Sequence, residues 1–127
     1  MQIKPYLFTS IIDTDYEISD ERAAEAIATG LKEIRKRRGY TLKEVEKETE
    51  IPNPTISRYE NKENIPSIVQ TLKLCTFYDI TIDEILLAGL MGEEDRNDFF
   101  DELEKSEKEN QEAFARLKAK HDAIKKE

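Results

Sequence analysis

The chain of 127 residues contains no tryptophan, one cysteine and one histidine, together with only four glycines and four prolines. A lone cysteine, Cys75, closes no internal disulfide, and a lone histidine, His121, provides neither a catalytic dyad nor a set of metal ligands. The sequence also lacks an apolar run of about 18 residues, so we expect no membrane span. The segment around Lys4 is too weakly apolar for a secretory signal. These absences favour a cytoplasmic protein.

No catalytic constellation is present either. The sequence contains no phosphate-binding loop, no nucleophile motif and no pair of carboxylates in a supporting context. The acidic cluster Glu93-Glu94-Asp95 is explained by a helix start, where negative charge meets the positive end of the helix dipole. We therefore expect no enzyme, no catalytic residue, no cofactor and no metal site.

The net charge of −8 argues at first against a nucleic-acid partner, but the charge is unevenly distributed. Residues 32–73 carry ten Lys and Arg against seven Asp and Glu, whereas the rest of the chain carries ten against twenty-one. A basic segment within an acidic protein predicts weak non-specific binding to nucleic acid and strong salt sensitivity.

Capping signals divide residues 19–91 into five predicted helices. The first begins near Ser19 and runs to Arg38, where Gly39 stops it, and Gly30 inside it is expected to permit close packing. The fourth begins after Ser67, and its predicted inward face consists of Ile68, Leu72, Cys75 and either Phe77 or Tyr78. The fifth opens with a capping box at Thr81-Ile82-Asp83-Glu84, and Gly89 and Gly92 mark a boundary after it.

The second and third helices are short and are joined by a tight turn within residues 41–60. Thr41 and Glu44 form a capping box that opens the second helix. Pro52 interrupts the helical register because proline lacks a backbone donor. Asn53-Pro54 then restarts the helix, since asparagine is a favoured N-cap and proline fits the first helical position.

The third helix is predicted to show a polar face. Ile56 and Tyr59 point inward, which leaves Thr55, Ser57 and Arg58 displayed outward. A short, capped, polar-faced helix held at an angle by its neighbour has the geometry that enters a DNA major groove.

With its flanks, this stretch resembles the helix-turn-helix domains of the Xre/Cro phage-repressor family. The resemblance covers residues 31–86 and is carried by LKEIRKRRG, by Val45 and Ile51, and by TISRYENK followed by Pro66. It implies an all-α fold: a five-helix repressor-like bundle with a short N-terminal extension and a long C-terminal helix. It also implies that Arg35 on the first helix pairs with Glu60, which closes the recognition helix.

We expect two groups of DNA contacts. Arg58 can reach guanine, Asn53 can address an adenine, and Thr55 and Ser57 can bond base edges or phosphates. Around that helix, backbone phosphates are expected to be held by Thr41, Lys43, Asn61 and Lys62.

The predicted domains are an N-terminal arm over 1–18, the helix-turn-helix domain over 19–91, and a charged C-terminal helix over 92–127. The arm contains YLFTSII and either packs on its own domain or crosses to a partner subunit. The C-terminal helix places on one heptad seam Phe100, Leu103, Asn110, Phe114, Leu117 and Ile124, with Glu107 and His121 at the other two positions. A second register, through Phe99, Leu103, Ala113, Leu117 and Ile124, fits equally well and stays open. Self-association, packing on the domain, binding of a regulatory protein and a solvated single helix all remain open for this helix.

Two functional hypotheses follow. The first is a sequence-specific transcriptional regulator, interpreted as a repressor, that binds a palindromic operator in double-stranded DNA as a homodimer or higher oligomer. The resemblance implies a bacterial or phage-encoded protein. The second is an antirepressor or adaptor that kept the fold and lost DNA binding. Leu42, Glu46 and Glu50 motivate it, because the family often has Gln, Ala and Gly there, and Glu50 implies a different or strained turn.

Overall fold

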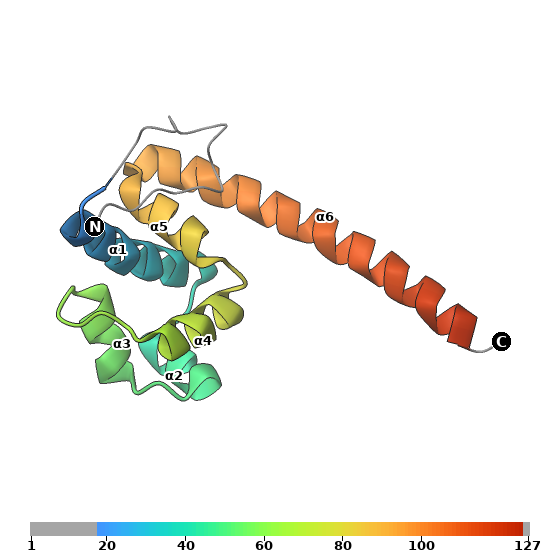
Figure 1. Cartoon of the computed structure of the whole chain (residues 1–127), viewed down its shortest axis with the longest axis horizontal. Coiled ribbons are helices and arrows are strands. Elements are labelled where there is room, and N and C mark those ends of the chain that lie inside the picture. The colour runs from blue at the N-terminus through green and yellow to red at the C-terminus, as the bar shows by residue number, and fades with distance from the viewer. Residues whose placement is uncertain (1–17, 126–127) are drawn as a thin grey trace. The chain divides into compact units, whose positions relative to one another are not determined.

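Six α-helices make up almost all of residues 18–125, which are the residues that the computed structural model describes (Figure 1). They are α1 (Asp20–Arg38), α2 (Leu42–Thr49), α3 (Asn53–Glu60), α4 (Ile68–Tyr78), α5 (Ile82–Leu90) and α6 (Glu93–Lys125). The predicted all-α fold, with five shorter helices and a long C-terminal one, is confirmed. The predicted N-terminal arm lies, apart from Ile18, outside the described residues.

Local capping chemistry sets most helix starts. The side chains of Ser19 and Ser67 each accept a hydrogen bond from a backbone N–H in the first turn of their helices. Complete capping boxes at Thr41 and Thr81 confirm those two predictions. The prediction that Asn53 caps α3 is wrong: Pro52 is the N-cap, and no side chain caps this helix.

The pairing of α1 with α5 is the closest in the domain, and the two helices lie side by side in Figure 1. A Cβ added at Gly30 would overlap the backbone carbonyl of Ile85, and one added at Gly89 would overlap the carbonyl of Ala26. The prediction for Gly30 is thus confirmed. Gly89 marks no boundary, because it lies buried within α5.

The inward face of α4 matches the predicted one only at Tyr78, which is buried. Ile68 is 77% exposed and Leu72 is 61% exposed, whereas Thr71 and Leu74 are buried in their place. Both sets have helical spacing, so periodicity alone cannot choose between them. Burial of Thr71 carries little cost because its hydroxyl donates to the carbonyl of Ser67 at 2.8 Å.

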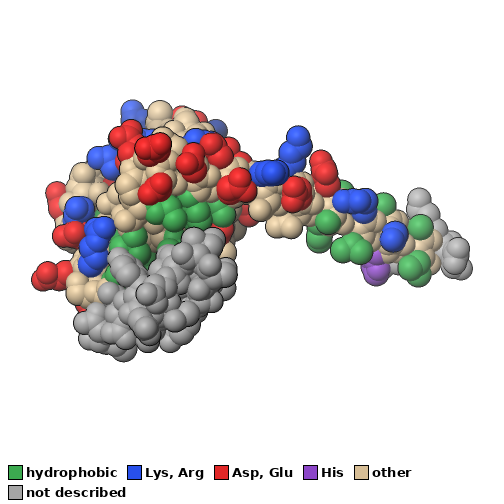
Figure 2. All heavy atoms as spheres, turned by 90° about the horizontal axis from the view of Figure 1, so that it is seen from above, with side chains coloured by type: hydrophobic (Ala, Val, Ile, Leu, Met, Phe, Trp, Pro, Cys, Tyr) green, Lys and Arg blue, Asp and Glu red, His purple; other side chains and the backbone are tan. Residues whose placement is uncertain are grey.

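The chain divides into two compact units, residues 1–92 and residues 93–127. The second is α6, whose 33 residues make a helix about 50 Å long. Along α6, Figure 2 shows hydrophobic side chains and the single histidine on one edge. Between residues 18 and 125, no helix combines the length and apolarity needed to cross a membrane.

Candidate nucleic-acid interface

The turn between α2 and α3 is fixed by backbone geometry and by one hydroxyl. Glu50 adopts the left-handed conformation with φ 63°, and its N–H donates to the carbonyl of Glu46 at 2.8 Å. Thr49 is buried, and its hydroxyl donates to the carbonyl of Val45 at 2.7 Å. The same hydroxyl oxygen, Thr49 Oγ1, accepts a hydrogen bond from the N–H of Ile51 at 3.3 Å. The turn therefore forms with a glutamate where a glycine is the residue of lower conformational cost.

α3 rests on its apolar side and shows its polar side. Ile56 and Tyr59 are buried, which confirms their predicted inward orientation, and Ile51 in the preceding turn is fully buried. Arg58 is exposed, and Thr55 is partly exposed. With eight residues, α3 is about 12 Å long, close to the width of a B-DNA major groove.

An ion pair joins the last turn of α1 to the end of α3. Arg35 Nε donates to Glu60 Oε2 at 2.8 Å and Nη2 donates to Oε1 at 2.9 Å, so the contact is bidentate. The third nitrogen, Nη1, donates to the carbonyl of Tyr40 at 2.9 Å. The hydrogen bond to Glu60 raises the pKa of Arg35 above its ordinary value. A planar fork bound at three points fixes the orientation of α3 as well as its position.

Asn53 is held from the neighbouring helix. Its Nδ2 donates to Oε2 of Glu46 on α2 at 2.9 Å. The amide retains a second N–H and its carbonyl oxygen, the two groups that a bidentate contact with adenine requires. Glu46 thus orients Asn53, a role that the sequence did not reveal because the two residues lie on opposite sides of the turn.

Three other predicted contact residues also bond within the protein. Asn61 Nδ2 donates to Ser57 Oγ at 3.2 Å, which joins the exposed C-cap residue of α3 to a partly exposed side chain one turn earlier. The Thr41 hydroxyl accepts from the backbone N–H of Glu44 at 3.2 Å as part of its capping box. These bonds restrict the side-chain rotamers before any ligand arrives, which lowers the entropic cost of binding.

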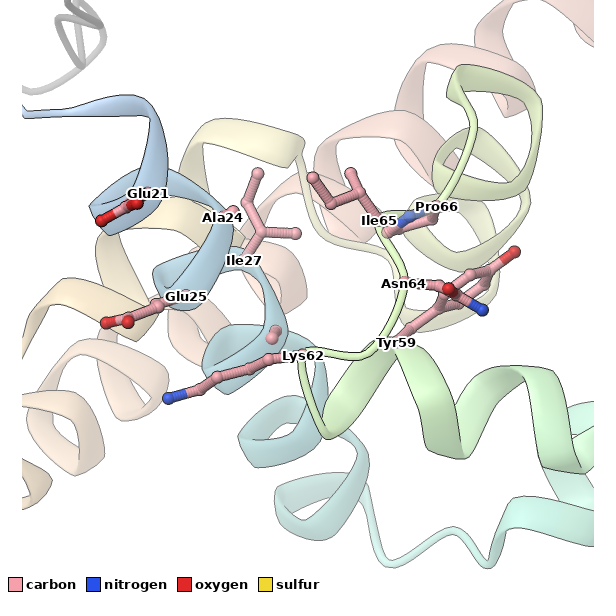
Figure 3. A pocket seen from close by; sticks show the side chains of 10 residues that line it. Glu21, Ala24, Glu25, Ile27, Tyr59, Lys62, Asn64, Ile65 and Pro66 are labelled. Atoms are coloured by element: carbon pink, nitrogen blue, oxygen red, sulfur yellow. The ribbon is translucent and has the colours of Figure 1, made fainter.

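The cationic residues around α3 occupy different surroundings. Arg58 and Lys43 are exposed and form no ion pair with any residue in the described part of the chain. Lys62 has φ 67° and lines a pocket of about 250 Å³ between α1 and the segment after α3. Figure 3 shows its side chain extending toward the wall formed by Glu21 and Glu25. Lys62 therefore lines this pocket in addition to being a predicted phosphate contact.

Within residues 18–125, no group of three His, Cys, Asp or Glu side chains is arranged to hold a metal ion. The chemistry available at the α2–α3 surface is hydrogen bonding by amides and hydroxyls and charge pairing by Arg58 and Lys43. Such groups recognise base edges and phosphates.

Two short helices joined by a tight turn, with the second displayed outward, define a helix-turn-helix domain. Residues 31–85 match the helix-turn-helix family HTH_3, as the sequence resemblance predicts. No curated protein matches the chain.

Two solved structures share the fold. One is an HTH_3 family transcriptional regulator from Vibrio cholerae, at 24% identity and a TM-score of 0.50. That match covers 55% of this chain and only 39% of the Vibrio protein. The other is the clp gene regulator ClgR from Corynebacterium glutamicum, at 18% identity and a TM-score of 0.50, covering 75% of this chain and 88% of ClgR.

Proposed function

We propose that the protein is a sequence-specific DNA-binding transcriptional regulator that inserts α3 into the major groove. The observation that carries this proposal is the way in which the rest of the domain holds α3. Its apolar side is buried, Arg35 fixes its end through Glu60, and Arg58 stands exposed on its outer side. The match of residues 31–85 to the helix-turn-helix family HTH_3 supports the same function, as does the fold shared with the Vibrio transcriptional regulator.

The proposed contacts fall into two classes. Arg58, Asn53, Thr55 and Ser57 address base edges, with Asn53 oriented by Glu46. Thr41, Lys43, Asn61 and Lys62 hold phosphates on either side of the groove.

We further propose that the protein acts as a homodimer on a palindromic operator and represses by excluding polymerase. One eight-residue helix offers too small an interface for tight specific binding. Two-fold pairing places two recognition helices about one DNA turn apart, and the operator then repeats its half-site with inverted symmetry.

The test is selection of binding sites from a randomised duplex library, followed by fluorescence anisotropy of the selected site over a range of salt concentrations. Arg58→Ala should weaken the selected site by about 1–3 kcal/mol and relax the preference at one base pair per half-site. Lys43→Ala should weaken all sequences alike and reduce the salt slope by about 1. Arg22→Ala removes an exposed cation from the start of α1 and serves as the matched control.

The second candidate is an adaptor that kept the fold without DNA binding. The exposed carboxylates Glu48, near the end of α2, and Glu50, in the turn before α3, favour it, because carboxylates repel phosphate. Under this alternative, no duplex binds even at low salt and the wild type and Arg58→Ala behave alike, while a protein partner is retained in pull-down.

A further inference from the structure

We propose that α6 pairs with α6 of a second copy of this chain in antiparallel orientation. The proposal does not rest on DNA binding, since it concerns only the helix formed by residues 93–125. Two features carry it: an uncovered apolar seam, and a separation of charge along the helix axis.

The seam consists of residues spaced alternately three and four apart. Phe114, Leu117 and Ile124 are 69%, 65% and 70% exposed, although each is a large apolar side chain. Asn110 and His121 complete the same stripe, and both are exposed. This spacing keeps the residues on one narrow face over about four helical turns, which is the arrangement that a partner helix covers. The hydrophobic edge in Figure 2 belongs to this helix.

The two halves of α6 carry opposite charge. Residues 93–112 contain ten Asp and Glu against three Lys and Arg, whereas residues 113–125 contain four Lys and Arg against one Asp. The helix dipole accounts for acidic residues in the first turn and basic residues in the last, because its effect fades within one turn. It does not account for an acidic excess that continues through about five turns.

This charge separation selects the orientation of the pair. In a parallel pair, the acidic half of each helix faces the acidic half of the other, and the basic halves face each other as well. In an antiparallel pair centred between Phe114 and Leu117, residues 106–112 of each copy, with three Glu against one Lys, face residues 119–125 of the other, with two Lys against one Asp. Complementary charges flanking an apolar seam determine helix orientation in coiled coils, so the antiparallel arrangement is favoured.

The seam also fixes a register. With the two-fold axis between Phe114 and Leu117, each Phe114 lies beside Leu117 of the second copy, and these four side chains form the centre. Asn110 of each copy then lies beside His121 of the other, on both sides of that centre. An amide and an imidazole can exchange a hydrogen bond, so the flanking layers satisfy their polar groups.

Mass measurement on the full chain tests the pairing. Light scattering and sedimentation should give twice the chain mass of 14.8 kDa. Leu117→Lys removes two seam leucines per dimer and introduces two charges, so it should raise the dimer dissociation constant more than about 100-fold. Ala119→Lys adds the same charge on the opposite side of α6 and should leave that constant nearly unchanged. A monomeric wild type, or a Leu117→Lys variant that dimerises as tightly as Ala119→Lys, overturns the proposal.

Disulfide trapping tests the orientation, in chains that also carry Cys75→Ser. Residues 110 and 121 are about 16 Å apart along a helix, too far for one disulfide. Asn110→Cys and His121→Cys should therefore not crosslink alone but should form a mixed disulfide when combined in glutathione buffer, identified by intact mass. Self-crosslinking of each variant, without the mixed species, shows a parallel pair and overturns the antiparallel arrangement. Ala119→Cys, on the side of α6 opposite the seam, gives the amount of disulfide that forms by random collision.

Salt dependence provides a second readout of orientation. Raising the salt to about 1 M shortens the Debye length to about 3 Å. The antiparallel dimer should weaken as its opposite charges are screened. A dimer that instead tightens with salt is held against charge repulsion, which contradicts the proposed orientation.

Discussion

The two sides of α1 meet their neighbours in different ways. Toward α5, Gly30 and Ala26 allow the two helix backbones to approach each other closely, so this contact depends on steric fit. Toward α3, Arg35 and Glu60 make a charged, bidentate contact with defined directions. A close apolar contact tolerates no added volume, whereas a charged fork fixes the angle of the helix that it holds. The first contact therefore determines whether the domain forms, and the second determines where the recognition helix points.

The largest effect is expected on the α5 side. Gly89→Ala places a methyl group on the backbone carbonyl of Ala26, and neither backbone can move without separating the two helices. The cost should be comparable with the whole stability of a small domain, about 5–15 kcal/mol. We expect loss of the cooperative thermal transition followed by near-ultraviolet circular dichroism. Gly92→Ala is the control, because a Cβ there meets nothing within 4 Å; equal behaviour of the two variants would refute the close packing.

The next largest effect is expected on α4, where one leucine is buried in the core and another is exposed. Leu74→Ala on α4 removes a fully buried side chain and should cost about 2–5 kcal/mol. Leu72→Ala removes the same atoms from the exposed face of the same helix and should change stability by less than about 0.5 kcal/mol. Urea unfolding midpoints measure both. Similar losses for the two variants would mean that the exposed face is covered in solution.

On the α3 side, Glu60→Gln should cost about 2–3 kcal/mol, because it leaves the Arg35 guanidinium partly buried without its carboxylate. Replacing both partners, as Arg35→Met with Glu60→Leu, should recover much of that stability. If the ion pair orients α3, the double variant should regain stability without regaining affinity for the selected DNA site. Losses of stability in Arg35→Met and in Glu60→Leu that simply add up in the double variant would argue against a coupled pair.

Local chemistry made much of this fold predictable. The capping boxes at Thr41 and Thr81 depend on residues three positions apart, and Gly39 ends α1 in the left-handed conformation that glycine adopts readily. The direction faced by α4 was not predictable, because it has apolar residues on two faces and the choice depends on what packs against it. The role of Gly89 is hidden from the sequence for the same reason.

The candidate site was predictable in outline and less so in its connections. The polar face of α3 follows from the inward spacing of Ile56 and Tyr59. The bond from Asn53 to Glu46 crosses a turn, and no short-range pattern in the sequence signals it. In the sequence, Glu46 stands out only as a departure from the family pattern.

The smallest effect concerns Tyr78, which lies near the charged contact. Its hydroxyl is buried and has no hydrogen-bond partner among residues 18–125. Tyr78→Phe should therefore raise stability at neutral pH slightly, by less than about 1 kcal/mol. The substitution breaks no hydrogen bond and removes a hydroxyl that is buried without a partner.

Burial, followed by the charge of Glu60, raises the pKa of Tyr78 above its ordinary value of 10. Below that value the hydroxyl is protonated in both the folded and the unfolded chain, so it adds no pH dependence. Above it, the unfolded chain loses the proton first and binds fewer protons, so stability falls as the pH rises. Tyr78→Phe should reduce this alkaline loss in urea midpoints measured from about pH 8 to about pH 11. An unchanged loss of stability would mean that water reaches the Tyr78 hydroxyl. The packing around the Arg35–Glu60 contact would then be looser than the packing between α1 and α5.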